Sequence, residues 1–139
     1  MRLLSVGLVC LLMAGCASSA IPVDEAFNAP ASDVFAFQSK GDSASAKITA
    51  LRDKGVVGSA CDIVVYIDGK KAANLGTGEK ASFWVQPGVR NVSIGSSNNG
   101  LCGGNALRTL SADLKSGEER IFRISIDVQG IYLNPYVEY

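Results

Sequence analysis

The sequence predicts a small antiparallel β-sandwich. Short segments are rich in β-branched and aromatic residues, turn-forming residues separate them at a spacing of roughly ten residues, and no segment has a convincing helical period. Roughly seven or eight strands fit this pattern. A chain of 139 residues has room for one such domain and an N-terminal extension.

The expected strands follow one another along the chain with turn residues between them. A candidate first strand spans Val34–Phe37, and Pro135 confines the last strand to a sheet edge because proline donates no ladder hydrogen bond. After the candidate first strand, we expect strands at Ile48–Arg52, Asp62–Asp68, Lys71–Leu75, Ala81–Val85, Arg90–Gly95, Ala106–Leu114, Glu119–Val128 and Ile131–Val137.

Two of these segments carry the clearest patterns. Asp62–Asp68 runs directly into Gly69, which is typical of a tight hairpin turn in which glycine takes a positive φ. In Glu119–Val128, apolar residues alternate with polar ones, which predicts one buried and one exposed face.

The first twenty residues predict export. Arg2 precedes an almost unbroken apolar run over Leu3–Met13, which is too short to cross a bilayer as a permanent helix of about 20 residues. Small residues follow, so we expect residues 1–15 to be a signal peptide that is removed. Met13-Ala14-Gly15-Cys16 also resembles the lipobox of bacterial lipoproteins, with Met in place of the usual Leu, and the resemblance implies lipidation of Cys16. The alternative is an ordinary secretory signal cut near Ala20.

The remainder of the chain divides into two parts by composition. Residues 16–45 are rich in Ala, Ser, Asp and Pro, so we expect a lipidated N-terminus and a flexible tether over Cys16–Pro30, followed by the candidate first strand. The β-sandwich domain then spans residues 46–139. Thirteen basic and thirteen acidic residues balance, so the chain lacks the electrostatic footprint of a nucleic-acid-binding protein. No second apolar stretch is long enough to span a membrane.

Two cysteines, Cys61 and Cys102, remain for pairing within the domain. In an oxidising envelope compartment we expect them to form one disulfide. The alternative is a pair of free thiols for redox or metal chemistry. The chain has no histidine and no C-x-x-C motif, so we expect no metal site.

The centre of the chain carries a resemblance to a known family. The segment Ile63–Leu75, then Gly78-Glu79-Lys80, then Phe83–Ile94, looks like a PEGA-type repeat, in which an "x-x-IDGK-x-x-A" hairpin precedes a strand ending in "PG-x-(H/R)-x-V". Arg52–Cys61 is similar to the "RD-x-G-x-x-G-x-x-C" entry of an uncharacterised sandwich domain of small bacterial lipoproteins. The resemblance covers roughly residues 48–128. It implies an envelope-facing, immunoglobulin-like or PEGA-like sandwich and assigns no catalytic residues.

The residues themselves argue against an enzyme. Without histidine, the usual proton shuttle near neutral pH is missing. Asp62 and Asp68 lie on one side of a strand but roughly 20 Å apart, too far to act on one bond. No serine lies in a G-x-S-x-G motif. We therefore expect neither catalysis nor a cofactor.

Two surfaces are candidates for binding. Tyr66, Trp84, Tyr132 and Tyr136 alternate with core residues and are expected to point outward, which suits protein or glycan contact. The alternative is that a loop or the Ala-rich N-terminal segment buries them. The second surface is the Gly- and Asn-rich loop Ser96–Asn105, with Leu101 as an apolar tip, and its alternative is an ordinary hairpin connection.

These features favour a lipid-anchored structural or adaptor module of the bacterial envelope, which contacts a protein partner through a sheet face or edge. The alternative is a periplasmic inhibitor or a glycan- or ligand-binding module that acts through the Cys102 loop or the aromatic face. Ala17 is not the aspartate that retains lipoproteins in the inner membrane, so the lipobox resemblance implies the outer membrane, facing the periplasm.

Overall fold

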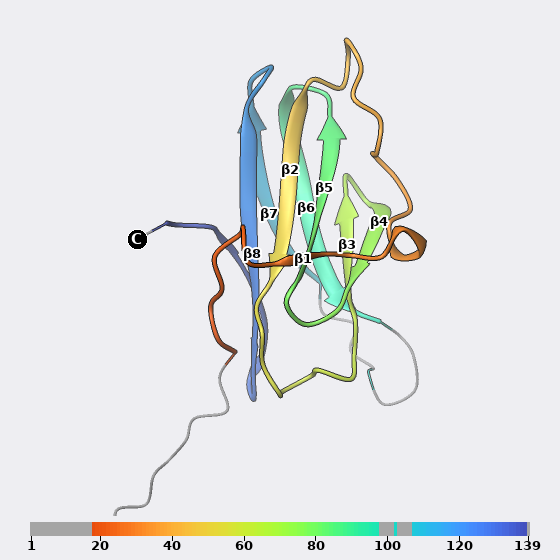
Figure 1. The fold of residues 1–139 in the computed structure, drawn as a ribbon. Coiled ribbons are helices and arrows are strands. Elements are labelled where there is room, and N and C mark those ends of the chain that lie inside the picture. The colour runs from red at the N-terminus through yellow and green to blue at the C-terminus, as the bar shows by residue number, and fades with distance from the viewer. Residues whose placement is uncertain (1–17, 98–101, 103–106, 139) are drawn as a thin grey trace, which may run out of the picture.

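Two β-sheets pack face to face in the computed structural model, which describes residues 18–97, 102 and 107–138 (Figure 1). This arrangement confirms the predicted β-sandwich. A short 3-10 helix, η1 (Ala31–Asp33), lies between β1 and β2. The strands are β1 (Phe27–Asn28), β2 (Ala46–Arg52), β3 (Ile63–Ile67), β4 (Lys70–Leu75), β5 (Glu79–Val85), β6 (Gly88–Ser96), β7 (Arg108–Leu114), β8 (Glu119–Asp127) and β9 (Gly130–Pro135). No helix in the described residues is long and apolar enough to cross a membrane.

The sequence predicts purely antiparallel pairing, but one of the two sheets also contains parallel pairs. One sheet has the order β1-β5-β2-β8-β9 and the other β4-β3-β6-β7. β2 pairs in parallel with β8, and β1 pairs in parallel with β5. A parallel pair needs a long connection between its strands. Between β2 and β8 the chain supplies one, because it passes through β3, β4, β6 and β7 of the opposite sheet.

The core lies between the two sheets and follows the predicted alternation. In β8, Phe122, Ile124 and Ile126 are buried, as the sequence predicts. They meet fully buried residues of the facing sheet such as Val65 and Ile94. Burial of these apolar side chains is the main force that holds the two layers together.

The hairpin between β3 and β4 has the predicted tight turn. Asp68 and Gly69 both have positive φ, at 48° and 80°, which the turn geometry with two left-handed residues requires. The Asp68 carboxylate accepts a hydrogen bond from the Asn91 backbone at 2.9 Å and pairs with Arg90 at 3.0 Å. These contacts fix the hairpin against β6.

The N-terminal segment differs from the expected flexible tether. Residues 18–30 lie against the five-stranded sheet, where Ile21 and Ala26 are buried over Leu51. The candidate strand Val34–Phe37 is also wrong, since only Val34 forms a β-bridge, with Ala73. The tether was expected because proline excludes a helix here, but proline does not prevent an extended segment from packing on the sheet.

The N-terminal segment continues to Phe37 and closes one side of the sandwich. Its backbone N–H groups donate to β5 and β4 in turn: Ala29 to Lys80 at 2.9 Å, and Phe35 to Ala72 at 2.8 Å. Farther on, the N–H of Trp84 donates to the Phe37 carbonyl at 2.7 Å. The open edges of β5 and β4 are thereby capped. β9 forms an edge on the opposite side, in agreement with the effect predicted for Pro135.

Candidate functional site

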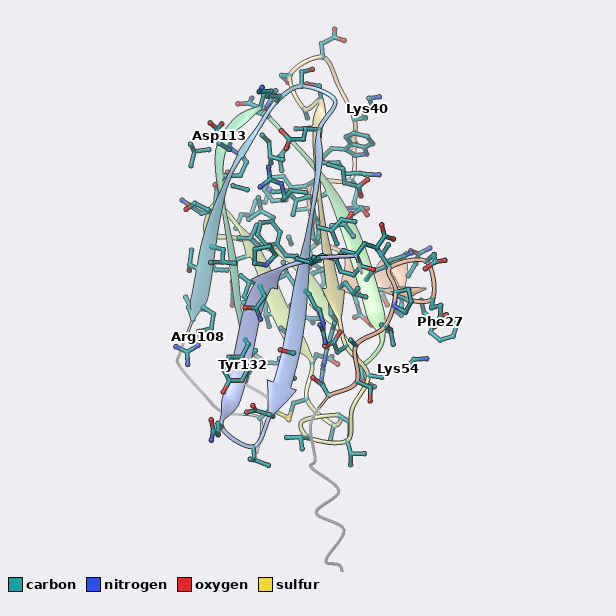
Figure 2. The ribbon with its side chains drawn as sticks, turned by 90° about the vertical axis from the view of Figure 1, so that its left-hand side faces the viewer. Phe27, Lys40, Lys54, Arg108, Asp113 and Tyr132 are labelled. Carbon is teal, nitrogen blue, oxygen red and sulfur yellow. A yellow bond between two sulfur atoms is a disulfide. The ribbon has the colours of Figure 1, made fainter. Side chains whose placement is uncertain are left out.

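Three of the four predicted aromatic residues lie on one face. Trp84 lies between the buried core residues Phe83 and Val85, so it projects from the outer face of the five-stranded sheet. Tyr132 reaches the same face from β9 (Figure 2). Tyr136, the residue after β9, lies on this face as well. Tyr66 belongs to β3 and therefore to the other sheet. All four side chains are half-buried, and Leu101 lies outside the described residues.

Lysine side chains cover the Trp84 ring. The ammonium groups of Lys40 and Lys47 lie 5.1 and 5.6 Å from its centroid. Lys47 also pairs with Glu119 at 3.3 Å. A cation over an aromatic ring is a favourable electrostatic contact. Trp84 is thus already engaged by the protein's own side chains.

The N-terminal segment covers Tyr136, which is the alternative that the sequence left open. The Tyr136 hydroxyl accepts a hydrogen bond from the Val23 backbone at 3.2 Å, and its ring packs on the cluster of Ile21, Ala26 and Leu51. Its backbone N–H donates to the Ile121 carbonyl at 2.9 Å. Tyr136 therefore joins the N-terminal segment to β8.

A groove of about 400 Å³ opens beside Tyr136 on this face. Its walls come from the two terminal parts of the described chain, and Arg123 of β8 contributes to its lining. Val137 borders it and is 59% exposed. The lining consists of Ala20, Ile21, Pro22, Arg123, Tyr136, Val137 and Glu138. This volume is in the range of sites that hold small ligands or short peptide segments.

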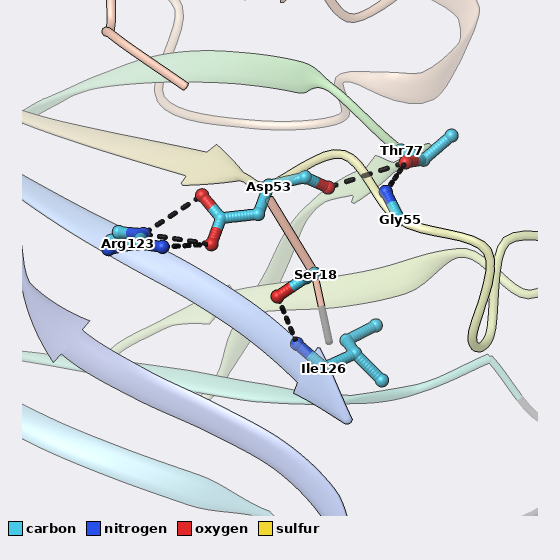
Figure 3. Close-up of polar contacts among 6 residues, drawn as sticks. All are labelled: Ser18, Asp53, Gly55, Thr77, Arg123 and Ile126. Atoms are coloured by element: carbon cyan, nitrogen blue, oxygen red, sulfur yellow. Dashed lines mark hydrogen bonds and ion pairs between the residues drawn. The ribbon is translucent and has the colours of Figure 1, made fainter. Parts of the chain in front are cut away.

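A network of polar contacts fastens the N-terminal segment at one end of the sandwich (Figure 3). Ser18 and Ile126 exchange two hydrogen bonds, from the Ser18 N–H at 3.3 Å and to the Ser18 hydroxyl at 3.2 Å. Ser19 and Lys54 exchange two backbone hydrogen bonds, at 2.6 and 3.2 Å. Asp53, one residue before Lys54, is buried and binds Arg123. We call this end of the sandwich, where β2 ends at Arg52 and β8 ends at Asp127, the Ser18 end.

Arg52 is buried within the Ser18 end and organises the loop that follows it. Its guanidinium donates to the carbonyls of Cys61 and Leu75, each at 2.7 Å, and of Gly58 at 2.8 Å. Burial lowers the pKa of Arg52, while Asp62 and Glu79 oppose that shift. Arg52 and Asp53 were expected only as part of a family resemblance, and their buried roles were not predicted. The sequence signal that could have identified these roles is a charged pair, Arg52 and Asp53, at the end of a strand.

The predicted disulfide between Cys61 and Cys102 is confirmed, with their Cα atoms 5.5 Å apart. It closes the loop after β2 against the segment before β7, at the Ser18 end. A smaller cavity of about 160 Å³ lies beside it, lined in part by Ile63, Ile126 and Ile131.

Three aromatic residues of the N-terminal segment were not predicted as surface residues. Each ring lies near a lysine ammonium group. The distance from the ammonium to the ring centroid is 5.9 Å for Lys54 and Phe27, 4.7 Å for Lys71 and Phe35, and 5.6 Å for Lys70 and Phe37. Phe27 is the most exposed of the three, and Figure 2 shows it beside Lys54. Only the path of the segment over two sheet edges brings these pairs together.

The described residues contain no cluster of three or more histidine, cysteine, aspartate or glutamate side chains that could hold a metal ion. Comparison with protein-family models, with curated proteins and with solved structures found no match for this chain.

Proposed function

We propose that this protein is a lipid-anchored, non-catalytic module of the bacterial envelope that binds another protein. The signal-like residues 1–15 and the lipobox-like Cys16 support the anchor. Ala17 favours the outer membrane with the domain facing the periplasm. The tight turn at Asp68 and Gly69 is compatible with a PEGA-like hairpin, and we retain that relationship as part of the proposal.

The groove beside Tyr136 carries the protein-binding part of the proposal. Apolar side chains, Ile21, Pro22 and Val137, form much of its lining, while Arg123 and Glu138 add opposite charges. An extended segment of a partner protein with apolar side chains suits this composition, because apolar contacts supply binding energy and the charges orient the segment.

In-cell crosslinking of the full-length tagged protein tests this function. Val137 and Val89 are exposed to almost the same extent, 59% and 58%, and only Val137 lines the groove. We expect Val137→Asp to lose a protein partner that the wild type and Val89→Asp both retain, because a carboxylate in the groove is costly to desolvate. Cys16→Ser should reduce capture of the same partner by removing the anchor. Equal capture by Val137→Asp and the wild type would refute the groove as the binding site.

The inhibitor alternative predicts a different result. A soluble hydrolase captured equally by the wild type and by Cys16→Ser, and lost with Leu101→Asp, would replace the adaptor with an inhibitor that acts through the Cys102 loop. Intact mass of the same material reports the lipid on Cys16 directly. A wild-type mass that lacks the lipid would refute the anchor.

A further inference from the structure

The contacts of Ser18 leave almost no slack between the lipidation site and the folded domain. Ser18 is held by Ile126, and Ser19 by Lys54. Gly55 approaches Ser18 so closely that a side chain at this glycine would meet the Ser18 Cα at 3.0 Å. A residue spans at most about 3.6 Å of chain, so the Cα of Cys16 lies within about 7 Å of that of Ser18.

The Ser18 end also carries two unusually exposed apolar side chains. Val56 and Val128 are 87% and 80% exposed, the highest values among the exposed large hydrophobic residues of the described chain. Val56 lies in the loop after Lys54, and Val128 in the turn between β8 and β9. The two segments are neighbours, because a side chain at Gly58 would contact Ile126 at 3.5 Å. Water is an unfavourable environment for both valines.

The charges around these valines are mixed. Lys54, two residues before Val56, is basic, whereas Asp127, next to Val128, is acidic. The Asp127 carboxylate already accepts hydrogen bonds from the backbone of Gln129 and Gly130, at 2.7 and 3.1 Å. Electrostatic attraction alone therefore does not indicate what the Ser18 end contacts. The exposed apolar side chains and the position of the anchor indicate a membrane surface.

We propose that the domain stands end-on on the bilayer, with Val56 and Val128 inserted among the lipid headgroups. This inference rests on the lipid anchor of the proposed function. A diacylated cysteine within about 7 Å of Ser18 brings the Ser18 end to the membrane surface, and apolar side chains in the interfacial layer add to the binding. The long axes of β2 and β8 then point away from the membrane, since both strands end at the Ser18 end (Figure 1).

The opposite end provides a matched control. Val89 pairs with Asp113 next to the turn that precedes β8, whereas Val128 follows the last residue of β8. A nine-residue strand spans roughly 25 Å, so the two valines lie at different heights above the proposed membrane surface.

Tryptophan depth measurement tests this orientation. Val128→Trp and Val89→Trp, each combined with Trp84→Phe, are purified in lipidated form and reconstituted in vesicles of phosphatidylethanolamine and phosphatidylglycerol at 3:1. Some of these lipids carry bromine on their acyl chains. We expect the bromines to quench Val128→Trp roughly twofold or more over Val89→Trp, with blue-shifted emission for Val128→Trp only.

Two other outcomes would refute either the end-on orientation or the lipid anchor. Weak, equal quenching of both probes in protein that carries the lipid and sediments with the vesicles would refute the end-on orientation and leave the anchor intact. A mass without lipid would refute the anchor and, with it, the orientation. Matched unfolding temperatures of the two variants verify that both are folded.

Discussion

Arg123 binds Asp53 through three hydrogen bonds of 2.6 to 2.9 Å, although 70 positions separate the two residues. The Asp53 side chain has no solvent exposure, whereas that of Arg123 is 32% exposed. The pair joins the residue after β2 to β8 where the N-terminal segment is fastened. It fixes the position of the Ser18 end.

Asp53→Asn should lower the free energy of unfolding by about 3 kcal/mol, because it removes one partner of a largely buried ion pair. Urea denaturation measures this loss. The exposed pair of Asp68 and Arg90 provides the control, and Asp68→Asn should cost about 1 kcal/mol or less. Equal losses for the two variants would contradict the importance of burial at Asp53.

Arg52→Lys should also destabilise the domain, by about 3 kcal/mol. A lysine ammonium is a single point donor and cannot reproduce the fork that satisfies the carbonyls of Gly58, Cys61 and Leu75. Arg120→Lys is the control, since Arg120 pairs with the nearby Glu118 on the surface. Amide hydrogen exchange should rise in the 54–62 loop for Arg52→Lys, and unchanged exchange there would count against the proposed role.

Removal of the disulfide should cost about 4 kcal/mol, because the bond links positions 41 residues apart and so restricts the unfolded chain. The double variant Cys61→Ser, Cys102→Ser measures this cost without added reductant. We expect the sandwich to remain folded, since Arg52 still holds the 54–62 loop. A far-ultraviolet spectrum without strand signal would show that the disulfide is essential for the fold.

Ile21→Ala should lower the free energy of unfolding by about 2 kcal/mol, because Ile21 is buried over Leu51 and leaves a gap when shortened. Val56→Ala is the control, since Val56 is exposed and should change stability by about 0.5 kcal/mol or less. If Ile21→Ala matched this control, the N-terminal segment would be the flexible tether that its composition predicts.

Protonation of Glu118 in acid should lower the stability of the domain. Hydrogen bonds from the Lys115 backbone and from Arg120 lower the pKa of this carboxyl below its ordinary value of 4.5. Its contribution is complete above that ordinary value and is lost as the pH falls through the lower folded-state pKa. Glu118→Gln should therefore flatten the decline in unfolding temperature below pH 4.5. An unchanged acid limb relative to wild type would contradict this assignment.

The alternation of apolar residues was enough to predict most strands, because a strand with one buried face has a period of two. The turn at Asp68-Gly69 could also be predicted from the sequence, because its backbone conformation depends on these two residues themselves. The parallel pairing of β2 with β8 was not readable, because no local pattern records which distant strand becomes a neighbour. The candidate site depended on the same long-range contacts.

The sequence by itself determined the sandwich, its core-facing residues and the pairing of the two domain cysteines, because periodicity and cysteine count are properties of the chain alone. Tertiary structure alone decided that residues 18–30 pack against the sheet, that Tyr136 lies beneath them, and that Arg52 and Asp53 are buried. An Ala- and Pro-rich segment has little intrinsic preference, so its conformation follows the apolar surface that a distant strand offers it.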